Sequence, residues 1–211
     1  MPVRALLFDF NGTLSNDEPL LCELFCDLFA KRGLPLSSQE YFDRLAGLSD
    51  PEIVRTWLGH DDSELLAEHV RGYLARAGDG STVLPEVADA VRAAAGRARL
   101  AVVSGALREL VEAVLAGAGL TGLFDAVVTA EDVARGKPNP AGYLRALELL
   151  QASPAEAVAI EDSEDGVAAA KAAGVYVVAV LGTVEPSRLR GADEIVERLD
   201  TALVERVLVR A

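Results

Sequence analysis

Short apolar runs alternate with amphipathic stretches along most of the chain. Runs rich in Val, Leu or Ala predict buried strands over residues 3–8, 100–103, 126–129, 157–160 and 175–180. Apolar residues at helical spacing predict helices over residues 86–97, 108–118, 141–150 and 165–173. Parallel strands that helices cover on both faces read as continuous apolar runs. The pattern therefore predicts an α/β fold with a doubly wound, Rossmann-like parallel sheet, with Gly119 and Gly174 ending two of its helices.

Residues 16–83 interrupt this alternation. Leu and Phe recur at helical spacing over residues 20–29, and Gly33-Leu34-Pro35 ends that pattern. Further helices are predicted over residues 37–45, 51–58 and 63–77, with no strand pattern between them. We therefore expect an all-helical cap, or lid, over residues 16–83, inserted into an α/β core domain of residues 1–15 and 84–211. One continuous α/β domain with a long crossover is the alternative.

Polar residues follow the predicted strands where each one ends. Asp9 follows the first run, Ser104-Gly105 follow the second, and Glu161-Asp162 follow the fourth. Lys137 stands in a turn bounded by prolines, just before a predicted helix. Since the carboxyl ends of parallel strands meet at one edge of the sheet, where open α/β folds bind ligands, these residues are candidates for a single site.

This set contains the groups that phosphoryl transfer needs. Asp9 offers a nucleophile, Ser104 a hydroxyl donor and Lys137 a fixed cation. Adjacent carboxylates at a buried strand end repel each other and are costly to desolvate unless a cation joins them, and oxygen ligands of this kind suit Mg²⁺.

Each of these residues also has a simpler interpretation when it is taken alone. Lys137 fits a solvated loop residue, Ser104 fits a helix N-cap, and Glu161 and Asp162 fit caps of the helix that follows them. Their order and spacing across the whole sheet favour one shared site.

The segment Asp9-Phe10-Asn11-Gly12-Thr13-Leu14 resembles the opening motif of the haloacid dehalogenase superfamily, Asp-x-Asp-Gly-Thr-Leu. The three later motifs, around Ser104, Lys137 and Glu161-Asp162, also resemble those of the superfamily, over nearly the full length of the chain. The helical insert is similar to the lid of β-phosphoglucomutase and phosphoglycolate phosphatase relatives.

The resemblance implies a role for each residue. Asp9 would be the nucleophile that becomes an aspartyl phosphate, and Lys137 would bridge it and the phosphoryl group. Ser104, the N–H of Gly105 and Thr13 would bind the phosphoryl oxygens.

The same resemblance implies a Mg²⁺ site. The ion would be held by Asp9, by the backbone carbonyl of Asn11 and by Asp162. Glu161 would contact it directly or through water.

Asn11 departs from the superfamily pattern, in which a second aspartate protonates the leaving alcohol and then activates water. An amide cannot transfer a proton, and general acid–base catalysis typically contributes about 10²–10⁴-fold. We expect slow hydrolysis of alkyl phosphates and a smaller effect on acyl or aryl phosphates. Asp17 is a candidate substitute acid, although capping the first helix of the lid is the role we favour for it.

The lid supplies a further clue about the substrate. Where β-phosphoglucomutase relatives carry Lys-Gly-x-Ser-Arg, the chain reads Ala46-Gly47-Leu48-Ser49-Asp50, so both cations are missing. We expect Gly47 and Leu48 to face the substrate. The loop indicates a substrate that is not strongly anionic beyond its phosphate, and it argues against a mutase.

Composition narrows the possible partners. A net charge of −13 without a cluster of Lys or Arg argues against nucleic acid and anionic membranes as partners.

The spacing of Cys22 and Cys26, four residues apart, favours reduced thiols on one helix face over a disulfide or half a metal site. No secretory signal or apolar run of membrane-spanning length is apparent, so we expect a cytoplasmic protein, monomeric by default.

The sequence therefore predicts a Mg²⁺-dependent phosphatase of a small phosphorylated metabolite, acting through Asp9. Two alternatives remain. The first is a protein that binds or senses a phosphorylated ligand and has lost turnover, which Asn11 motivates. The second is hydrolysis of a carbon–halogen or carbon–phosphorus bond, which other members of the superfamily perform.

Overall fold

A computed structural model describes residues 2–210. Within this range six parallel strands form one sheet in the order β3-β2-β1-β4-β5-β6. The strands are β1 Ala5–Phe8, β2 Arg99–Val103, β3 Ala126–Val128, β4 Ala157–Glu161, β5 Tyr176–Val180 and β6 Glu194–Val196. The central strand β1 pairs Phe8 with Val102 on β2 and with Ile160 on β4, so these three strands end side by side.

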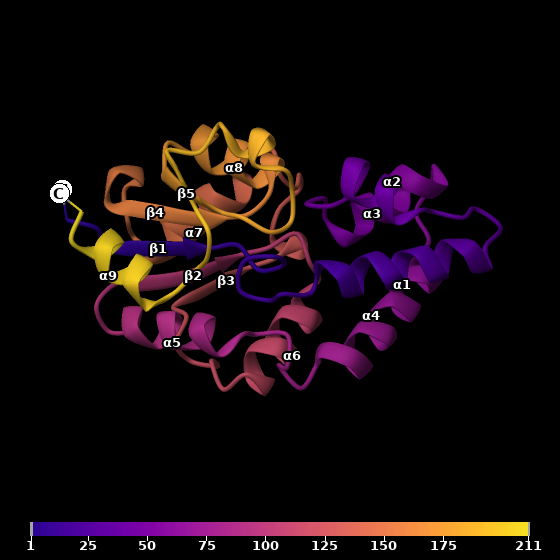
Figure 1. Cartoon of the computed structure of the whole chain (residues 1–211), viewed down its shortest axis with the longest axis horizontal. Helices are drawn as coiled ribbons and strands as arrows, with labels where there is room; N and C mark the ends of the chain where they lie inside the picture. The colour runs from indigo at the N-terminus through magenta and orange to yellow at the C-terminus, as the bar shows by residue number, and fades with distance from the viewer. Residues whose placement is uncertain (1, 211) are drawn as a thin grey trace.

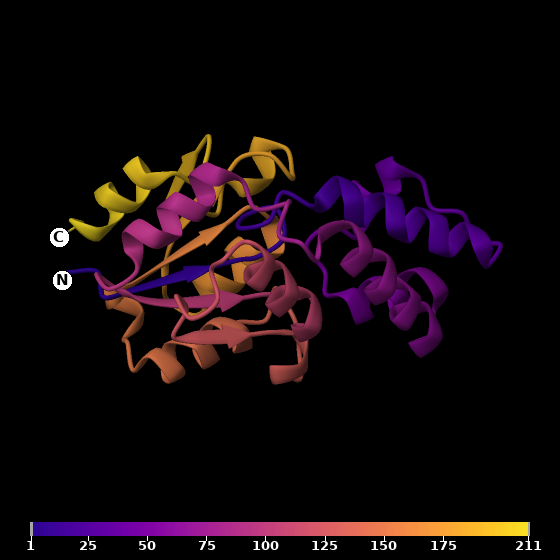
Figure 2. The ribbon, with the colours of Figure 1, turned by 90° about the horizontal axis from the view of Figure 1, so that it is seen from below.

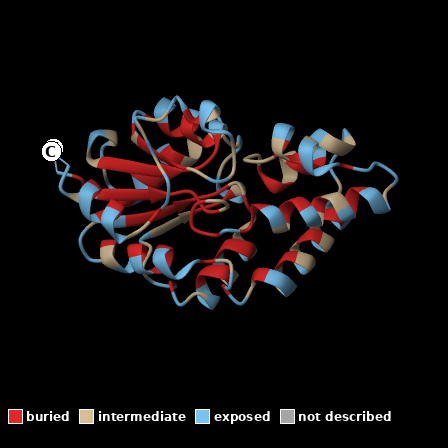
Figure 3. Ribbon diagram, in the orientation of Figure 1, coloured by how far each residue is buried: buried red, intermediate tan, exposed pale blue. Residues whose placement is uncertain are grey.

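Helices cover both faces of the sheet, as Figures 1 and 2 show. One face packs against α5 Pro85–Ala94, α6 Arg108–Gly117 and α9 Thr201–Leu208, and the other against α7 Ala141–Leu150 and α8 Glu164–Ala172. Side chains of β1 alternate between the faces, since Leu6 and Phe8 belong to the first core and Leu7 to the second. Both faces of the strands are therefore buried (Figure 3), which explains their continuous apolar runs.

The predicted doubly wound α/β fold is confirmed, with three differences in detail. Strand β6 was not predicted, because it is a three-residue edge strand in which Ile195 is exposed, so it lacks an apolar run. Helix α9, which Asp200 caps, was also missed. Helix α5 ends at Ala94 rather than at residue 97, because Ala95 adopts an extended conformation and Gly96 has a positive φ of 77°.

Four helices lie between β1 and α5, without a strand among residues 18–77. They are α1 Glu18–Lys31, α2 Ser38–Arg44, α3 Asp50–Leu58 and α4 Ser63–Ala77, and we call them the helical insert. Figures 1 and 2 show the helical insert as a lobe beyond the carboxyl ends of the strands. Aromatic rings fill its centre, where Phe25 stacks on His69 with 4.4 Å between ring centroids. The division of the chain at residues 15/16 and 83/84 stays a prediction.

Three short 3₁₀ helices complete the described elements. They span Ala130–Asp132, Pro154–Glu156 and Pro186–Leu189. On α1, the sulfur atoms of Cys22 and Cys26 lie 4.0 Å apart and are not bonded to each other. Among residues 2–210, no helix combines the length and the hydropathy that crossing a membrane requires.

Candidate active site

The strand register brings the predicted site residues to one edge of the sheet. Asp9 directly follows β1 and its N–H bonds the carbonyl of Ile160 on β4, at 2.9 Å. Ser104 follows β2 in the same way, and Glu161 and Asp162 stand at the end of β4. All four side chains are buried. The expectation that these residues share one site therefore agrees with their placement in the fold.

Lys137 enters this group from the loop before α7. Its ammonium donates hydrogen bonds to Asp9 Oδ1 and Glu161 Oε1, and it lies over the ring of Tyr143, 5.6 Å from the centroid. Burial lowers the pKa of Lys137, but the charges of Asp9 and Glu161 outweigh that effect and hold the pKa above its usual value. The interpretation of Lys137 as a solvated loop residue is therefore wrong.

Glu161 is the most heavily hydrogen-bonded carboxylate of the site. Its Oε1 accepts from Lys137 and from the Tyr143 hydroxyl at 3.0 Å. Its Oε2 accepts from the N–H groups of Asp162 and Ser163, at 2.9 and 3.1 Å, and from the Ser163 hydroxyl at 3.0 Å. The cap of α8 is Ser163, which accepts from the N–H of Gly166 at 3.1 Å. Glu161 and Asp162 are therefore not the caps of this helix.

Asp162 and Asp9 each have a carboxylate oxygen that a cation could bind. The Oδ1 of Asp162 accepts from the Thr13 hydroxyl at 3.1 Å, while its buried Oδ2 has no hydrogen-bond partner among the described residues. Burial raises the pKa of Asp162 well above its usual value. Burial also raises the pKa of Asp9, to about 7, against the opposing charge of Lys137.

The donor set fits Mg²⁺. Asp9, Glu161 and Asp162 each place a carboxylate oxygen within 4.8 Å of the others, and all three are buried. Three carboxylates face a single buried ammonium in this cluster, so negative charge remains that a divalent cation would neutralise. The Oδ2 of Asp162, which has no hydrogen-bond partner among the described residues, is free to bind a cation, and hard oxygen donors are those that Mg²⁺ prefers. The backbone carbonyl of Asn11 as a further ligand stays a prediction.

Ser104 and Gly105 lie where the helical insert meets the sheet. Ser104 Oγ accepts from the N–H of Ala106 at 3.0 Å, and α6 begins only at Arg108, so Ser104 is not its N-cap. A Cβ on Gly105 would stand 3.1 Å from the Cα of Ser49 in the helical insert. A glycine is therefore what lets the two parts of the chain approach so closely.

The prediction that Asp17 caps α1 is wrong. Asp17 occupies the N-cap position, but its side chain makes no capping hydrogen bond. Its Oδ2 instead accepts from Asn11 Nδ2 at 2.9 Å, from the Ser15 hydroxyl at 2.8 Å and from the hydroxyl of Tyr73 on α4. Burial raises the pKa of Asp17 to about 6. The carboxylate thus faces Asn11, on the side of the site where acid–base chemistry would be expected.

A small cavity of about 20 Å³ lies between the sheet edge and the helical insert. Asp9, Asn11 and Lys137 line it from one side, and the predicted lid residues Gly47 and Leu48 line it from the other. The roles of all these residues in binding substrate stay predictions.

Two polar residues at this cavity, Glu18 and Tyr41, were not among the predicted site residues, and Asp50 of the predicted lid loop lines it as well. The Tyr41 hydroxyl donates to Glu18 at 3.1 Å. Burial, followed by the charge of Asp17, raises the pKa of Glu18 to about 8. In the sequence, Glu18 looks like an ordinary first-turn acid of α1, and its contact with Tyr41 follows only from the packing of the fold.

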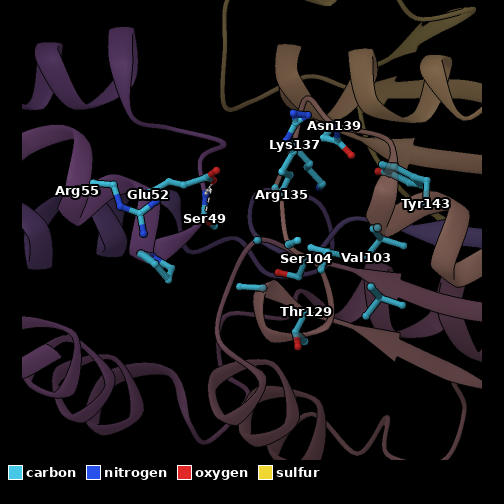
Figure 4. Close-up of a pocket in the computed structure, with 18 residues that line it drawn as sticks. Ser49, Glu52, Arg55, Val103, Ser104, Thr129, Arg135, Lys137, Asn139 and Tyr143 are labelled. Carbon is cyan, nitrogen blue, oxygen red and sulfur yellow. Dashed lines mark hydrogen bonds between the residues drawn. The ribbon is translucent and has the colours of Figure 1, made fainter. Parts of the chain in front are cut away.

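A larger cleft of about 190 Å³ adjoins Ser104, Gly105 and Lys137. Figure 4 shows that α3 supplies one wall, with Glu52 and Arg55, and that Ser104 and Lys137 lie on the other side. The lining mixes hydroxyl, amide and charged groups with apolar side chains of the strand ends. The cleft is thus large enough for a small polar molecule next to the catalytic candidates.

The chain is similar in sequence to known hydrolases. Residues 3–174 match the family of haloacid dehalogenase-like hydrolases. The chain is 30% identical to validoxylamine A 7'-phosphate phosphatase of Streptomyces hygroscopicus subsp. limoneus, over 93% of this chain and 94% of that protein. It is 32% identical to the fructose-1-phosphate phosphatase YqaB of Escherichia coli, over 83% of this chain and 95% of that protein.

A solved structure is similar over the same extent. It is a mutant of CbbY from Rhodobacter sphaeroides in complex with xylulose-1,5-bisphosphate, with a TM-score of 0.84 and 29% sequence identity. The similarity covers 93% of this chain and 95% of that one.

Gly166→Ala is expected to damage the carboxylate cluster. A Cβ at this position would lie 1.7 Å from Glu161 Oε1, and Glu161 cannot move without losing its hydrogen bonds. We expect a loss of about 1–3 kcal/mol of unfolding free energy, measured by urea denaturation. Gly72→Ala in α4 is the control, because its Cβ would meet only the end of Leu24, so that variant should be at least as stable as the wild type. Equal stability of both variants would contradict the role given to Glu161.

Glu18→Gln is expected to stabilise the chain at high pH only. The native state keeps the Glu18 proton up to pH about 8, whereas the unfolded chain releases it above pH about 4.5. Wild-type stability from this group is therefore complete below pH 4.5 and is lost as the pH rises to 8. The advantage of the variant should grow over that window to the order of 5 kcal/mol in urea denaturation.

Glu64→Gln is the matched control, because it changes an exposed acid in the first turn of α4. Its stability difference from the wild type should not depend on pH over the same window. A Glu18→Gln difference that is equally flat would contradict the raised pKa of Glu18.

Proposed function

The chain belongs to the haloacid dehalogenase-like hydrolase family, and from this premise we propose that it is a Mg²⁺-dependent phosphatase that acts through an aspartyl phosphate on Asp9. The observation that carries the proposal is the buried cluster at the end of β1 and β4. There Lys137 binds Asp9 and Glu161, and one oxygen of Asp162 has no hydrogen-bond partner within residues 2–210. Phosphoryl transfer depends on this combination of a positioned nucleophile and fixed charges.

Asp9 would act in two steps. In the first, a carboxylate oxygen of Asp9 attacks phosphorus and the bond from phosphorus to the ester oxygen breaks, so that the ester oxygen leaves with the bonding electron pair and takes its proton from solvent. In the second, water attacks the phosphorus of the aspartyl phosphate, which releases inorganic phosphate and restores the carboxylate. Lys137 orients Asp9 and neutralises charge on the transferring oxygens, and Ser104 and the N–H of Gly105 would donate hydrogen bonds to them.

Asp9, Asp162 and the carbonyl of Asn11 would hold Mg²⁺, with Glu161 contacting it directly or through water. When bound, the ion supplies positive charge for the phosphoryl oxygens. Besides its proposed contact with phosphate, Thr13 would orient Asp162, because its hydroxyl donates a hydrogen bond to that carboxylate.

Asn11 determines which esters react fast. The leaving alcohol needs a proton, and the amide of Asn11 has none to transfer. The amide is moreover engaged with the Asp17 carboxylate. Alkyl phosphates should therefore react slowly, while phosphates with good leaving groups should react more readily.

A small phosphorylated sugar or polyol is the substrate class that we propose. The cleft of about 190 Å³ beside Ser104 and Lys137 offers hydroxyl and amide groups next to apolar side chains, which suits a polyol. The names of the relatives point the same way, because one is a phosphatase of fructose 1-phosphate and another is a hexitol phosphatase. A monomer without nucleic-acid or membrane partners, located in the cytoplasm, stays a prediction.

Asn11→Asp is expected to raise hydrolysis of alkyl phosphates by about 10²–10⁴-fold, because it restores a general acid and base. Hydrolysis of p-nitrophenyl phosphate and acetyl phosphate should change far less. The measurement is phosphate release with Mg²⁺ from these esters and from fructose 1-phosphate. Asp9→Asn should be inactive in every case, and residual turnover by that variant would refute the aspartyl phosphate.

A phosphate-binding protein without turnover is the second candidate, which Asn11 favours. Saturable binding of a sugar phosphate by the wild type, with no phosphate released by either the wild type or Asn11→Asp, would support it. Rapid turnover of that ligand by the wild type would exclude it.

Mg²⁺ is expected to stabilise the wild type, by about 2.7 kcal/mol at a concentration 100 times its dissociation constant. Asp162→Asn should lose this effect while folding normally without metal, because it replaces a buried carboxylate whose Oδ2 has no hydrogen-bond partner among the described residues. The measurement is thermal unfolding with and without Mg²⁺. Asp165→Asn, in the first turn of α8, is the control and should keep the full shift. An equal shift in both variants would place the metal elsewhere.

A further inference from the structure

Asp50 of the helical insert lies against the sheet domain at the edge of the proposed site. It is the first residue of α3, and its side chain is only 6% exposed. Its Oδ2 accepts a hydrogen bond from the N–H of Leu107 at 3.1 Å, and its own N–H donates to the carbonyl of Gly105 at 3.3 Å. Asp50 also lines the small cavity together with Asp9 and Lys137.

The contact with Leu107 places a carboxylate at the amino end of α6. Helix α6 has ten residues, Arg108–Gly117, and Leu107 is its N-cap. The free N–H groups and the positive end of a helix dipole attract anions, and a second anionic group of a ligand would find this position beside Ser104. In this chain, two carboxylates occupy it: the buried Asp50, which accepts from the N–H of Leu107, and the exposed Glu131, which accepts from the N–H of Arg108 at 3.0 and 3.2 Å.

His69 lies next to Asp50 in the interior of the helical insert. The imidazole is fully buried and neither ring nitrogen has a hydrogen-bond partner among the described residues. Its Nε2 lies 3.6 Å from Asp50 Oδ1, and its ring is stacked on Phe25. Asp50 is thus held between a rigid imidazole and the end of α6, so it cannot easily swing away to admit another anion.

We propose that Asp50 is a specificity-determining residue that restricts the site to phosphate monoesters whose remaining part carries no second anionic group. The proposal rests on the proposed phosphatase function and narrows its substrate class. A second phosphate near α6 would face a buried carboxylate instead of free N–H groups. Like charges at short range in a poorly hydrated site repel strongly, so a bisphosphate should bind much more weakly than a monophosphate.

The cations at the neighbouring cleft do not restore a second anion site. Arg55 is largely exposed and is paired with Asp61 at 2.8 Å, and Arg135 is exposed at the cleft. Charges in contact with water are screened within about 10 Å by salt. Glu52, which lines the same cleft, further offsets their field. The buried Asp50 therefore dominates the discrimination close to the phosphoryl group.

The test compares the affinities of fructose 1-phosphate and fructose 1,6-bisphosphate by calorimetry, in an Asp9→Asn background that prevents consumption of either ester. We expect the monophosphate to bind at least ten-fold more tightly. Asp50→Asn and Asp50→Ser should each reduce this ratio at least ten-fold, because they remove the charge and keep an acceptor for Leu107. Asp43→Asn, an exposed acid on α2, should leave the ratio unchanged.

Equal affinity for both esters, or a ratio that neither Asp50 variant changes, would overturn the proposal. Thermal unfolding of each variant identifies any that fails to fold, and the second Asp50 variant then decides. Phosphate release by the chain with native Asp9 reports separately on the proposed function. Its absence would refute the phosphatase while the affinity ratio still decides the role of Asp50.

Discussion

The burial of three carboxylates at one edge of the sheet is the constraint on which the site depends. Charges removed from water are costly unless they are paired and hydrogen-bonded. Lys137 meets part of that cost, and the remaining donors converge on Glu161 from Tyr143 and from the turn after β4. The same crowding explains Gly12 and Gly166, where a Cβ would lie 1.9 Å from Asp162 and 1.7 Å from Glu161. The glycines, the ion pair and the three carboxylates thus form one unit.

Sheet topology decides where this unit lies. Strand order reverses between β1 and β4, since the chain runs outward to β2 and β3 on one side and to β5 and β6 on the other. Ligands of open α/β sheets bind at such a reversal, beyond the carboxyl ends of the strands. Asp9 and Glu161 directly flank it, and the helical insert begins only nine residues after Asp9. The first connection of the fold is therefore free to become a cover for the site.

The site residues that directly follow strands could be predicted from the sequence, because the end of a strand is visible in the local pattern of apolar residues. Asp9, Ser104 and Glu161-Asp162 each follow an apolar run, and the parallel register then brings them together without further information. Glu18 and Tyr41 were missed, and the contacts of Asp50 with Leu107 and His69 were not predicted, because they come from packing that no local pattern reveals. Asp17 was assigned wrongly for the same reason, since its partners include Tyr73, far along the chain.

Asn11 and Asp17 form a complementary pair in the interior of the site. The amide donates to a carboxylate that is completely buried and that also accepts from Ser15 and Tyr73. An aspartate at position 11 would place a second carboxylate next to Asp17 in the same buried space, whereas the amide of Asn11 donates a hydrogen bond to Asp17. Through Asp17, Asn11 is connected to Tyr73 on α4 of the helical insert. The amide at position 11 is therefore integrated into the packing between the site and its cover, which ties the chemistry of the site to the placement of the helical insert.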